Sequence, residues 1–246
     1  MIKVLVIGEI CVDKFVYCKT DRISPEAPVP VINPIKTTTN PGMAGNTVAN
    51  IKALFPNVKV EGIHQRQKVT KTRFVEDKSN HMFVRLDEGD DFVTPLDWEK
   101  EVYASIKESD VVIVSDYDKG FLSDSDLKAI AYRSKLSILD SKRKLTDDIT
   151  KDFTFVKLNE SESNNNKSLN EDNVIVTVGK KGAWYKGVLY GSPNPQDTID
   201  VSGAGDTFTS AFIVKYFKLQ NVDEAIKYAN IKASEVVSKR GVVVPS

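Results

Sequence analysis

Short runs of apolar, often β-branched residues recur along the chain and are separated by segments with helical spacing. Runs of this kind are typical of strands buried on both faces, because a half-exposed strand alternates apolar and polar residues. The expected strands are Ile2–Ile7, Val111–Val114, Leu136–Leu139, Phe153–Val156 and Val174–Val178. The expected helices are Met43–Phe55, Leu96–Lys107, Ser125–Ser134, Ala204–Lys218 and Val222–Lys239. This alternation predicts an α/β fold in which helices flank a mostly parallel central sheet.

Two stretches depart from this rhythm, at about 15–38 and 71–87, because they alternate polar and apolar residues. They predict a small antiparallel β flap, or lid, beside the main sheet. Four prolines fall in the first stretch, at Pro25, Pro28, Pro30 and Pro34. Proline cannot donate to a strand ladder, so these residues favour an edge of the flap. The apolar positions Val29, Val31 and Ile35 would then be exposed unless something covers them. The Asn-rich tract at 161–173 is expected to be a solvated loop.

Composition limits the classes of function. A chain of 246 residues can bury a substantial core, and we expect residues 1–246 to form a single domain that includes the flap. Lysine and arginine number 34, as do aspartate and glutamate, so no global field favours nucleic acid or an anionic membrane. An anionic ligand must therefore be held by a local site. Two cysteines and two histidines argue against a zinc site or a disulfide framework, which leaves a hard cation on oxygen ligands.

Targeting signals are not evident in the pattern. The longest apolar runs are far too short to span a bilayer. The first residues carry only a short apolar stretch before Glu9 and Asp13, unlike a signal peptide. We therefore expect a cytoplasmic protein.

The segment most suggestive of chemistry is Asp200–Thr207, which joins an extended run to an amphipathic helix. Its small residues allow backbone N–H groups to approach a ligand, and a helix N-terminus favours an anion. Asp206 then stands where an anion would bind. The alternative is that Asp206 only caps the helix, although capping does not explain Gly203 and Gly205. The segment lacks the Gly-Lys-Ser/Thr ending of a P-loop and is not a Gly-x-Gly-x-x-Gly fingerprint.

A second glycine segment, Pro41–Asn46, opens the helix that continues through Asn50. Taken alone it is typical of a turn and an N-cap. Taken with Asp200–Thr207 it predicts the second side of a cleft.

Three ordered segments resemble the motifs of the ribokinase-like (PfkB) carbohydrate kinases: Gly42–Asn50, Asn159–Glu162 and Asp200–Thr207. Four more resemble the D-glycero-D-manno-heptose-7-phosphate kinases within that family, namely Arg22–Pro30, Lys71–Arg73, Arg85–Asp87 and Ser115–Gly120. The resemblance implies a ribokinase-like fold and a homodimer paired through the flap. It also implies that ATP, with Mg²⁺, phosphorylates the anomeric hydroxyl of heptose 7-phosphate to give the 1,7-bisphosphate.

The resemblance also implies roles for individual residues. Asp206 would be the general base, and the amides of Gly203, Ala204 and Gly205 would stabilise the transferring phosphoryl group. Asn159 and Glu162 would act near the metal, through water. Their alternative role is a helix start with an Asn cap.

For the sugar phosphate, the implied binding residues are Asp13, Gly42, Gly45, Asn46, Arg73, Arg85, Asp116 and Lys119. Of these, Arg73, Arg85 and Lys119 are the candidates for the 7-phosphate, because a dianion needs local cations. The alternatives are a surface-turn aspartate and solvated basic side chains. For the nucleotide, the implied residues are Asn159, Thr177, Gly179, Gly182, Asn230 and Lys142. A plain β-hairpin turn would also account for the two glycines.

The chain departs from the family in several places. In the heptose kinases the kinase domain is often the N-terminal half of a bifunctional protein, whose other half is a nucleotidyltransferase. The present sequence resembles only the kinase half, so only the kinase step is expected. The 55–71 connection leaves room for one strand at 58–63 and for no further βα unit. Two smaller departures are Ser202, where the family motif usually has Thr or a similar small residue, and Asp140-Ser141-Lys142, where Asp-Pro-Lys is usual. Two alternatives stay open: a ribose-type or fructose-type kinase, and a non-catalytic sugar-binding or nucleotide-binding remnant.

Overall fold

A computed structural model describes residues 1–193 and 203–237 of the chain. Asp200, Val201 and Ser202, the first residues of the Asp200–Thr207 segment, lie outside these ranges, as do Ser238 and Lys239 at the end of the last expected helix.

The central sheet has the strand order β12-β11-β10-β9-β8-β7-β1-β4. Its strands are β1 (Lys3–Gly8), β4 (Lys59–Ile63), β7 (Val111–Asp116), β8 (Ser137–Ser141), β9 (Phe155–Asn159), β10 (Val174–Thr177), β11 (Ala183–Tyr185) and β12 (Val188–Tyr190). From β10 to β4 every pair of neighbouring strands is parallel, and β11 and β12 add an antiparallel edge. The mostly parallel sheet and its five expected strands are confirmed.

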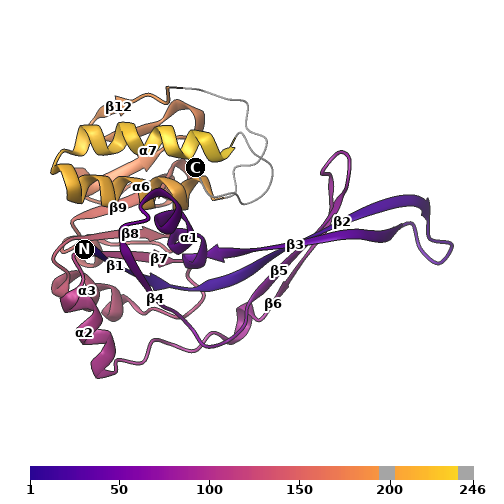
Figure 1. The fold of residues 1–246 in the computed structure, drawn as a ribbon, viewed down its shortest axis with the longest axis horizontal. Helices are drawn as coiled ribbons and strands as arrows, with labels where there is room; N and C mark the ends of the chain where they lie inside the picture. The colour runs from indigo at the N-terminus through magenta and orange to yellow at the C-terminus, as the bar shows by residue number, and fades with distance from the viewer. Residues whose placement is uncertain (194–202, 238–246) are drawn as a thin grey trace.

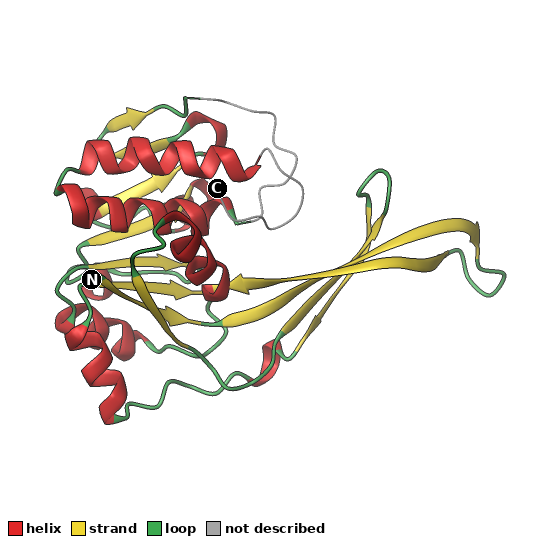
Figure 2. Ribbon diagram, in the orientation of Figure 1, coloured by secondary structure: helices red, strands yellow, loops and turns green. Residues whose placement is uncertain are grey.

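Helices cover both faces of this sheet (Figure 2). α1 (Ala44–Leu54), α6 (Ala204–Leu219) and α7 (Val222–Val237) pack on one face, in a core that includes Val4 and Val6. α2 (Lys100–Glu108), α3 (Asp124–Arg133) and α4 (Asp147–Thr150) pack on the other, in a core that includes Leu5 and Ile7. Successive residues of β1 thus enter opposite cores, which explains why the strand is apolar without alternation.

The flap is a second sheet, with the strand order β3-β2-β5-β6, that extends away from the body of the molecule (Figure 1). Its strands are β2 (Ile10–Ile23), β3 (Pro30–Met43), β5 (Thr70–Glu76) and β6 (Met82–Glu88). Pro30 and Pro34 lie on the edge strand β3, as expected. The expectation of an antiparallel flap was wrong in one respect, because β2 and β5 pair in parallel.

The connection between β4 and β5 is short. Residues 64–69, all of them described, carry the chain from β4 to β5 without a helix. β4 is accordingly the edge of the central sheet, which agrees with the short 55–71 connection.

The Asn-rich tract at 161–173 is not the loop that was expected: it contains most of α5 (Glu160–Asn165) and the 3₁₀ turn η2 (Glu171–Asn173). The remaining short turns are η1 (Asp90–Phe92) and η3 (Gly179–Lys181).

Within the described ranges, no helix combines the length and the hydropathy that a membrane span requires.

Candidate active site

Asp206 is the third residue of α6 and lines a cavity of about 530 Å³. Gly203 caps this helix with φ of 86°, a left-handed conformation that favours glycine. The amides of Gly203, Ala204 and Gly205 therefore belong to the first turn, where helix N–H groups lack intrahelical partners. All three residues line the cavity. The structure thus places the candidate base and the candidate amides at one wall of a single cavity.

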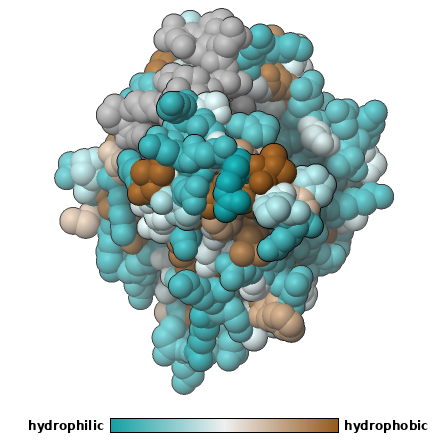
Figure 3. Space-filling model, turned by 90° about the vertical axis from the view of Figure 1, so that its right-hand side faces the viewer, coloured by the Kyte–Doolittle hydropathy of each residue, from teal (hydrophilic) through white to brown (hydrophobic). Residues whose placement is uncertain are grey.

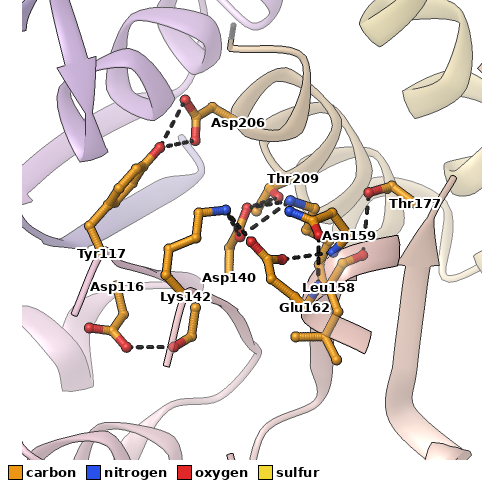
Figure 4. Close-up of polar contacts among 12 residues, drawn as sticks. Asp116, Tyr117, Asp140, Lys142, Leu158, Asn159, Glu162, Thr177, Asp206 and Thr209 are labelled. Carbon is orange, nitrogen blue, oxygen red and sulfur yellow. Dashed lines mark hydrogen bonds and ion pairs between the residues drawn. The ribbon is translucent and has the colours of Figure 1, made fainter. Parts of the chain in front are cut away.

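Two side chains from distant parts of the chain, Asn46 and Tyr117, donate to the Asp206 carboxylate, and Figure 4 shows the contact with Tyr117. Asn46, in the first turn of α1, donates from Nδ2 to Asp206 Oδ2 at 2.8 Å. Tyr117, just after β7, donates from its hydroxyl to Asp206 Oδ1 at 3.2 Å. Asn46 Oδ1 is buried and has no hydrogen-bond partner among the described residues. The two glycine segments therefore meet at the Asp206 carboxylate, where Asn46 retains a free acceptor, although no residue of Pro41–Asn46 is among those that line the cavity.

The environment separates two buried carboxyl groups by their acidity. Burial, and then the charge of Asp140, raise the pKa of Asp206 from 3.8 to about 6. Burial also tends to raise the pKa of Asp140, but Lys157 and Lys142 outweigh it and leave this pKa below its ordinary value. Asp140 thus stays ionised, while Asp206 is poised to take up a proton near neutral pH, as a general base must.

Lys157 is a component of the site that the sequence patterns did not single out. Its side chain is 2% exposed, lies on β9 and donates to Asp140 Oδ2 at 3.0 Å. A Cβ atom at position 205 would lie 2.9 Å from Lys157 Nζ. Gly205 therefore makes room for a buried ammonium group beside the first turn of α6. Lys157 also lines the cavity, so positive charge gathers where an anion would meet the helix N-terminus.

Asn159 and Glu162 form a capping box at the start of α5. Glu162 Oε2 accepts from the Asn159 backbone N–H at 2.7 Å, and Asn159 Oδ1 accepts from the Glu162 N–H at 2.8 Å. Glu162 Oε1 also accepts from Lys142 at 2.5 Å. Burial tends to lower the pKa of Lys142, but Asp140 and Glu162 raise it above its usual value. The structure thus realises the helix-start alternative, and it places Asn159 and Lys142 in the wall of the cavity.

The remaining candidates for nucleotide binding line the same cavity: Thr177, Gly179, Gly182 and Asn230. β10 and β11 pair antiparallel, so the two glycines do lie in a hairpin connection. Gly182 has φ of 106°, and a Cβ there would lie 2.0 Å from the Tyr190 carbonyl oxygen. Asn230 is tied to the same carbonyl at 2.8 Å. The hairpin and the wall of the cavity are one and the same segment.

The candidate sugar residues lie where the flap meets α1. Asp13 is buried on β2, and its Oδ1 accepts from Arg73 at 2.5 Å. Gly42 is required by close approach, because a Cβ there would lie 2.3 Å from Asp13 Oδ2. Gly45 lies in the first turn of α1. Arg73 also stacks over the Phe15 ring, 5.1 Å from its centroid.

The other basic candidates of the flap region are paired with carboxylates. Arg85 donates to both oxygens of Asp87, at 2.7 and 2.8 Å. Lys119 and Lys71 share Asp90, with N–O distances of 2.9 and 3.2 Å. These side chains therefore form a partly exposed ion-pair network, in which Lys71 also approaches Asp87 at 3.7 Å.

Like the other sugar candidates, Asp116 is not among the residues that line the cavity. Its carboxylate is fully buried and accepts from Arg143 Nε at 2.6 Å and from Ser141 Oγ at 2.5 Å. Asp116 thus anchors the end of β7. Sequence patterns also missed Glu9, another fully buried carboxylate, which binds the backbone of the turn after β7.

In the two described ranges, 1–193 and 203–237, no three His, Cys, Asp or Glu side chains cluster as a protein-held metal site would require. Both oxygens of Glu162 already accept from nitrogen donors. Asn159 and Glu162 still suit Mg²⁺ that arrives with phosphates and keeps water ligands, because such an ion needs only one or two protein carboxylates nearby.

A buried carboxylate in the first turn of a helix, with the buried Lys157 beside it in the wall of a cavity, suits transfer of an anionic group to an acceptor that the carboxylate deprotonates. Residues 57–246 match the model of the pfkB family of carbohydrate kinases. The chain therefore belongs to the pfkB family, and it is a phosphotransferase that acts on a sugar hydroxyl.

Curated relatives carry the name bifunctional protein HldE. The protein from Nitratiruptor sp. is 28% identical over 290 aligned positions, which cover 97% of this chain and 62% of the relative. The protein from Campylobacter jejuni (strain RM1221) is 30% identical over 291 positions, which cover 98% of this chain and 62% of the relative. The chain thus spans less than two thirds of the length of these relatives. Because it has only 246 residues, each alignment must also contain gaps of more than 40 positions.

Solved structures show the same fold. Ribokinase from Arabidopsis thaliana, solved with ribose and ATP, aligns with a TM-score of 0.73 and 16% identity over 98% of this chain and 94% of its own. Phosphofructokinase-2 from Escherichia coli, solved with potassium, aligns with a TM-score of 0.74 and 15% identity over 100% of this chain and 96% of its own. The ribokinase-like fold expected from the motifs is confirmed.

Proposed function

We propose that this kinase uses ATP to phosphorylate the anomeric hydroxyl of D-glycero-D-manno-heptose 7-phosphate. The observation that carries the chemical part of the proposal is Asp206, a buried carboxylate with a pKa of about 6 in the first turn of α6. The sugar is proposed from the resemblance of Arg22–Pro30 and Ser115–Gly120 to the heptose kinases, with the curated relatives in support.

In the proposed reaction the sugar hydroxyl lies between Asp206 and the phosphoryl group. Asp206 takes the hydroxyl proton as that oxygen forms a bond to the γ-phosphorus, while the bond from the γ-phosphorus to the bridging oxygen breaks and ADP leaves with the electron pair. The amides of Gly203, Ala204 and Gly205 would receive the charge that develops on the phosphoryl oxygens. The free Oδ1 of Asn46 would accept from another sugar hydroxyl.

The nucleotide would occupy the cavity lined by Thr177, Gly179, Gly182 and Asn230. Lys142 and Lys157 would lie near its phosphates. Mg²⁺, when bound with ATP, would neutralise phosphate charge, and Glu162 and Asn159 would contact its water ligands. The Arabidopsis ribokinase, which was solved with ATP, supports the choice of nucleotide.

The 7-phosphate would bind to the ion-pair network of the flap. Arg73 and Lys119 are each paired with a carboxylate, Asp13 and Asp90 respectively. A phosphate dianion would compete with that carboxylate for the cation, and Arg73 could bind it bidentately. In this exchange each cation keeps an anionic partner. Asp90 would stay paired with Lys71, and the released Asp13 carboxylate would accept from sugar hydroxyls instead.

The test is ADP release with four acceptors: heptose 7-phosphate, the unphosphorylated heptose, fructose 6-phosphate and ribose. We expect the highest kcat/KM for heptose 7-phosphate, with a new phosphate on the anomeric carbon in the ³¹P NMR spectrum. Asp206→Asn serves as the matched control for a contaminating kinase. A preference for ribose or fructose 6-phosphate would replace the proposed sugar, and nucleotide binding without transfer to any acceptor would favour a binding remnant.

The proposal includes a homodimer paired through the flap. Val29, Ile35, Val84 and Leu86 lie on the flap and are each about half exposed. From the end to which the flap extends, apolar residues appear as patches within a hydrophilic surface (Figure 3). Light scattering should give twice the chain mass, and Val84→Glu should halve it. A wild-type monomer at micromolar concentration would overturn this part.

A further inference from the structure

The turn that follows β7 carries Tyr117 and is held more firmly than an ordinary surface turn. The buried Glu9 carboxylate accepts from three of its backbone N–H groups: those of Tyr117 at 2.9 Å, Lys119 at 3.0 Å and Phe121 at 3.3 Å. Hydrogen bonds to a buried carboxylate are stronger than those between neutral groups. The turn also contains Asp118 with φ of 56°. The backbone that presents Tyr117 is therefore fixed from inside the protein.

A second anchor lies directly before this turn. Asp116, at the end of β7, binds Arg143 through both carboxylate oxygens, at 2.6 and 2.9 Å. Arg143 in turn donates to the Leu122 carbonyl at 2.7 Å, on the far side of the turn. Two buried carboxylates, Glu9 and Asp116, thus stabilise the turn after β7, although neither lines the cavity.

The side chain that this segment presents is aimed at Asp206. The Tyr117 hydroxyl lies 3.2 Å from Asp206 Oδ1 and 3.5 Å from Oδ2 (Figure 4), and Asn46 Nδ2 donates to Oδ2 at 2.8 Å. The ring packs beside Cys11 and Met43 and lies under the Lys142 ammonium group, 5.6 Å from the ring centroid. Burial, and then the Asp206 carboxylate, hold the pKa of Tyr117 well above its usual value, so the hydroxyl remains a donor.

We propose that Tyr117 is a positioning residue for this phosphotransferase: its hydroxyl orients the Asp206 carboxylate and favours the ionised form that can accept the sugar proton. A donor to the charged form of an acid lowers the pKa of that acid. The other groups that face Asp206 are Asp140 from β8, Lys157 from β9, Lys142 after β8 and Asn46 from α1. Burial and Asp140 raise the pKa of Asp206, whereas the donor from Asn46 and the charges of Lys157 and Lys142 lower it. The Tyr117 hydroxyl adds a second donor to the ionised form.

The direct test removes only the hydroxyl. In Tyr117→Phe the ring, its contact with Lys142 and the Glu9 anchor remain. A hydrogen bond of ordinary net strength corresponds to a shift of about half to one pKa unit. We therefore expect the acidic limb of the kcat/KM profile to move to higher pH by that amount. The rate should fall several-fold at pH 6 and much less at pH 8, with an unchanged KM for ATP. Tyr132→Phe, which alters an exposed ring, is the matched control.

Two results would overturn the proposal. One is an unchanged acidic limb, and the other is a rate that falls equally at every pH, which would indicate only a structural role. The inference rests on Asp206 as the base of the proposed function, so a second readout is needed that requires no sugar. The ¹³C carboxyl resonance of Asp206 should titrate at higher pH in Tyr117→Phe than in the wild type. That measurement decides the role of Tyr117 even if no tested sugar is phosphorylated.

Discussion

Asp206→Asn is expected to stabilise the folded protein at neutral pH while it abolishes most of its activity. The folded state raises the pKa of this carboxyl from 3.8 to about 6, because Asp206 is buried and faces Asp140. One pKa unit corresponds to 1.36 kcal/mol, so ionised Asp206 costs the fold about 3 kcal/mol at pH 7. The asparagine NH₂ group would face the donors of Asn46 and Tyr117, and this mismatch would cost the variant about 1 kcal/mol of stability. The net gain is about 2 kcal/mol.

The pH dependence gives this prediction its sign. The folded pKa lies above the unfolded one, so the cost is fully present above about pH 6 and disappears as the pH falls toward 3.8. Urea unfolding at pH 7.5 and at pH 4 should therefore show Asp206→Asn more stable than the wild type at the higher pH and nearly equal at the lower one. Asp91→Asn, an exposed carboxylate, is the control and should show no such gap.

Activity must change in the opposite direction. Loss of a positioned base should lower kcat by about a hundredfold or more, with little change in ATP binding. A variant that is less stable than the wild type at pH 7.5, by an amount that does not depend on pH, would refute the assigned environment of Asp206. Turnover close to that of the wild type would remove Asp206 from the mechanism.

Three further substitutions test the walls of the site. Arg73→Gln should raise KM for heptose 7-phosphate about tenfold or more and leave KM for the unphosphorylated heptose unchanged; equal effects on both would count against a phosphate contact. Gly42→Ala places a Cβ 2.3 Å from Asp13 Oδ2, so KM for the sugar should rise while KM for ATP stays constant. Gly205→Ala displaces the flexible end of Lys157, so kcat should fall more than tenfold with a melting temperature within a few degrees of the wild type.

Local patterns predicted the central sheet well because its strands are covered on both faces. Val111–Val114 is apolar throughout, and the structure buries all four residues completely. The flap was harder to predict, because its side chains alternate in the same way whether neighbouring strands run parallel or antiparallel. The parallel pairing of Val12–Cys18 with Thr70–Glu76 joins segments more than 50 residues apart, and no local signal encodes it.

The site could be predicted only where small residues indicate that other atoms lie close to the backbone. Gly203 and Gly205 indicated the turn that opens α6. By contrast, Asp116 and Asp206 look alike in sequence, and their surroundings differ through contacts distant in the chain: Arg143 pairs with the first, whereas burial, and then Asp140, raise the pKa of the second. Lys157 left one usable signal, a lysine within the buried strand Phe155–Asn159, since lysine is almost never fully buried unless it is paired.

The short connection between β4 and β5 leads to the last prediction, that the chain is an active kinase despite its small size. Among the strands that the structure describes, β4 pairs only with β1 and forms the edge of the central sheet, whereas the residues that line the cavity all follow β7 in the chain. A fold whose central sheet ends at β4 therefore contains every wall of the cavity. Asn46 remains tied to Asp206, and Thr207 Oγ1 still donates to Asn50 Oδ1 at 3.2 Å, so α1 holds its position against α6. Purified protein should accordingly turn over a sugar phosphate at a rate that Asp206→Asn removes. Protein that binds ATP with Mg²⁺ but transfers no phosphate to any sugar or sugar phosphate would favour a non-catalytic binding remnant instead.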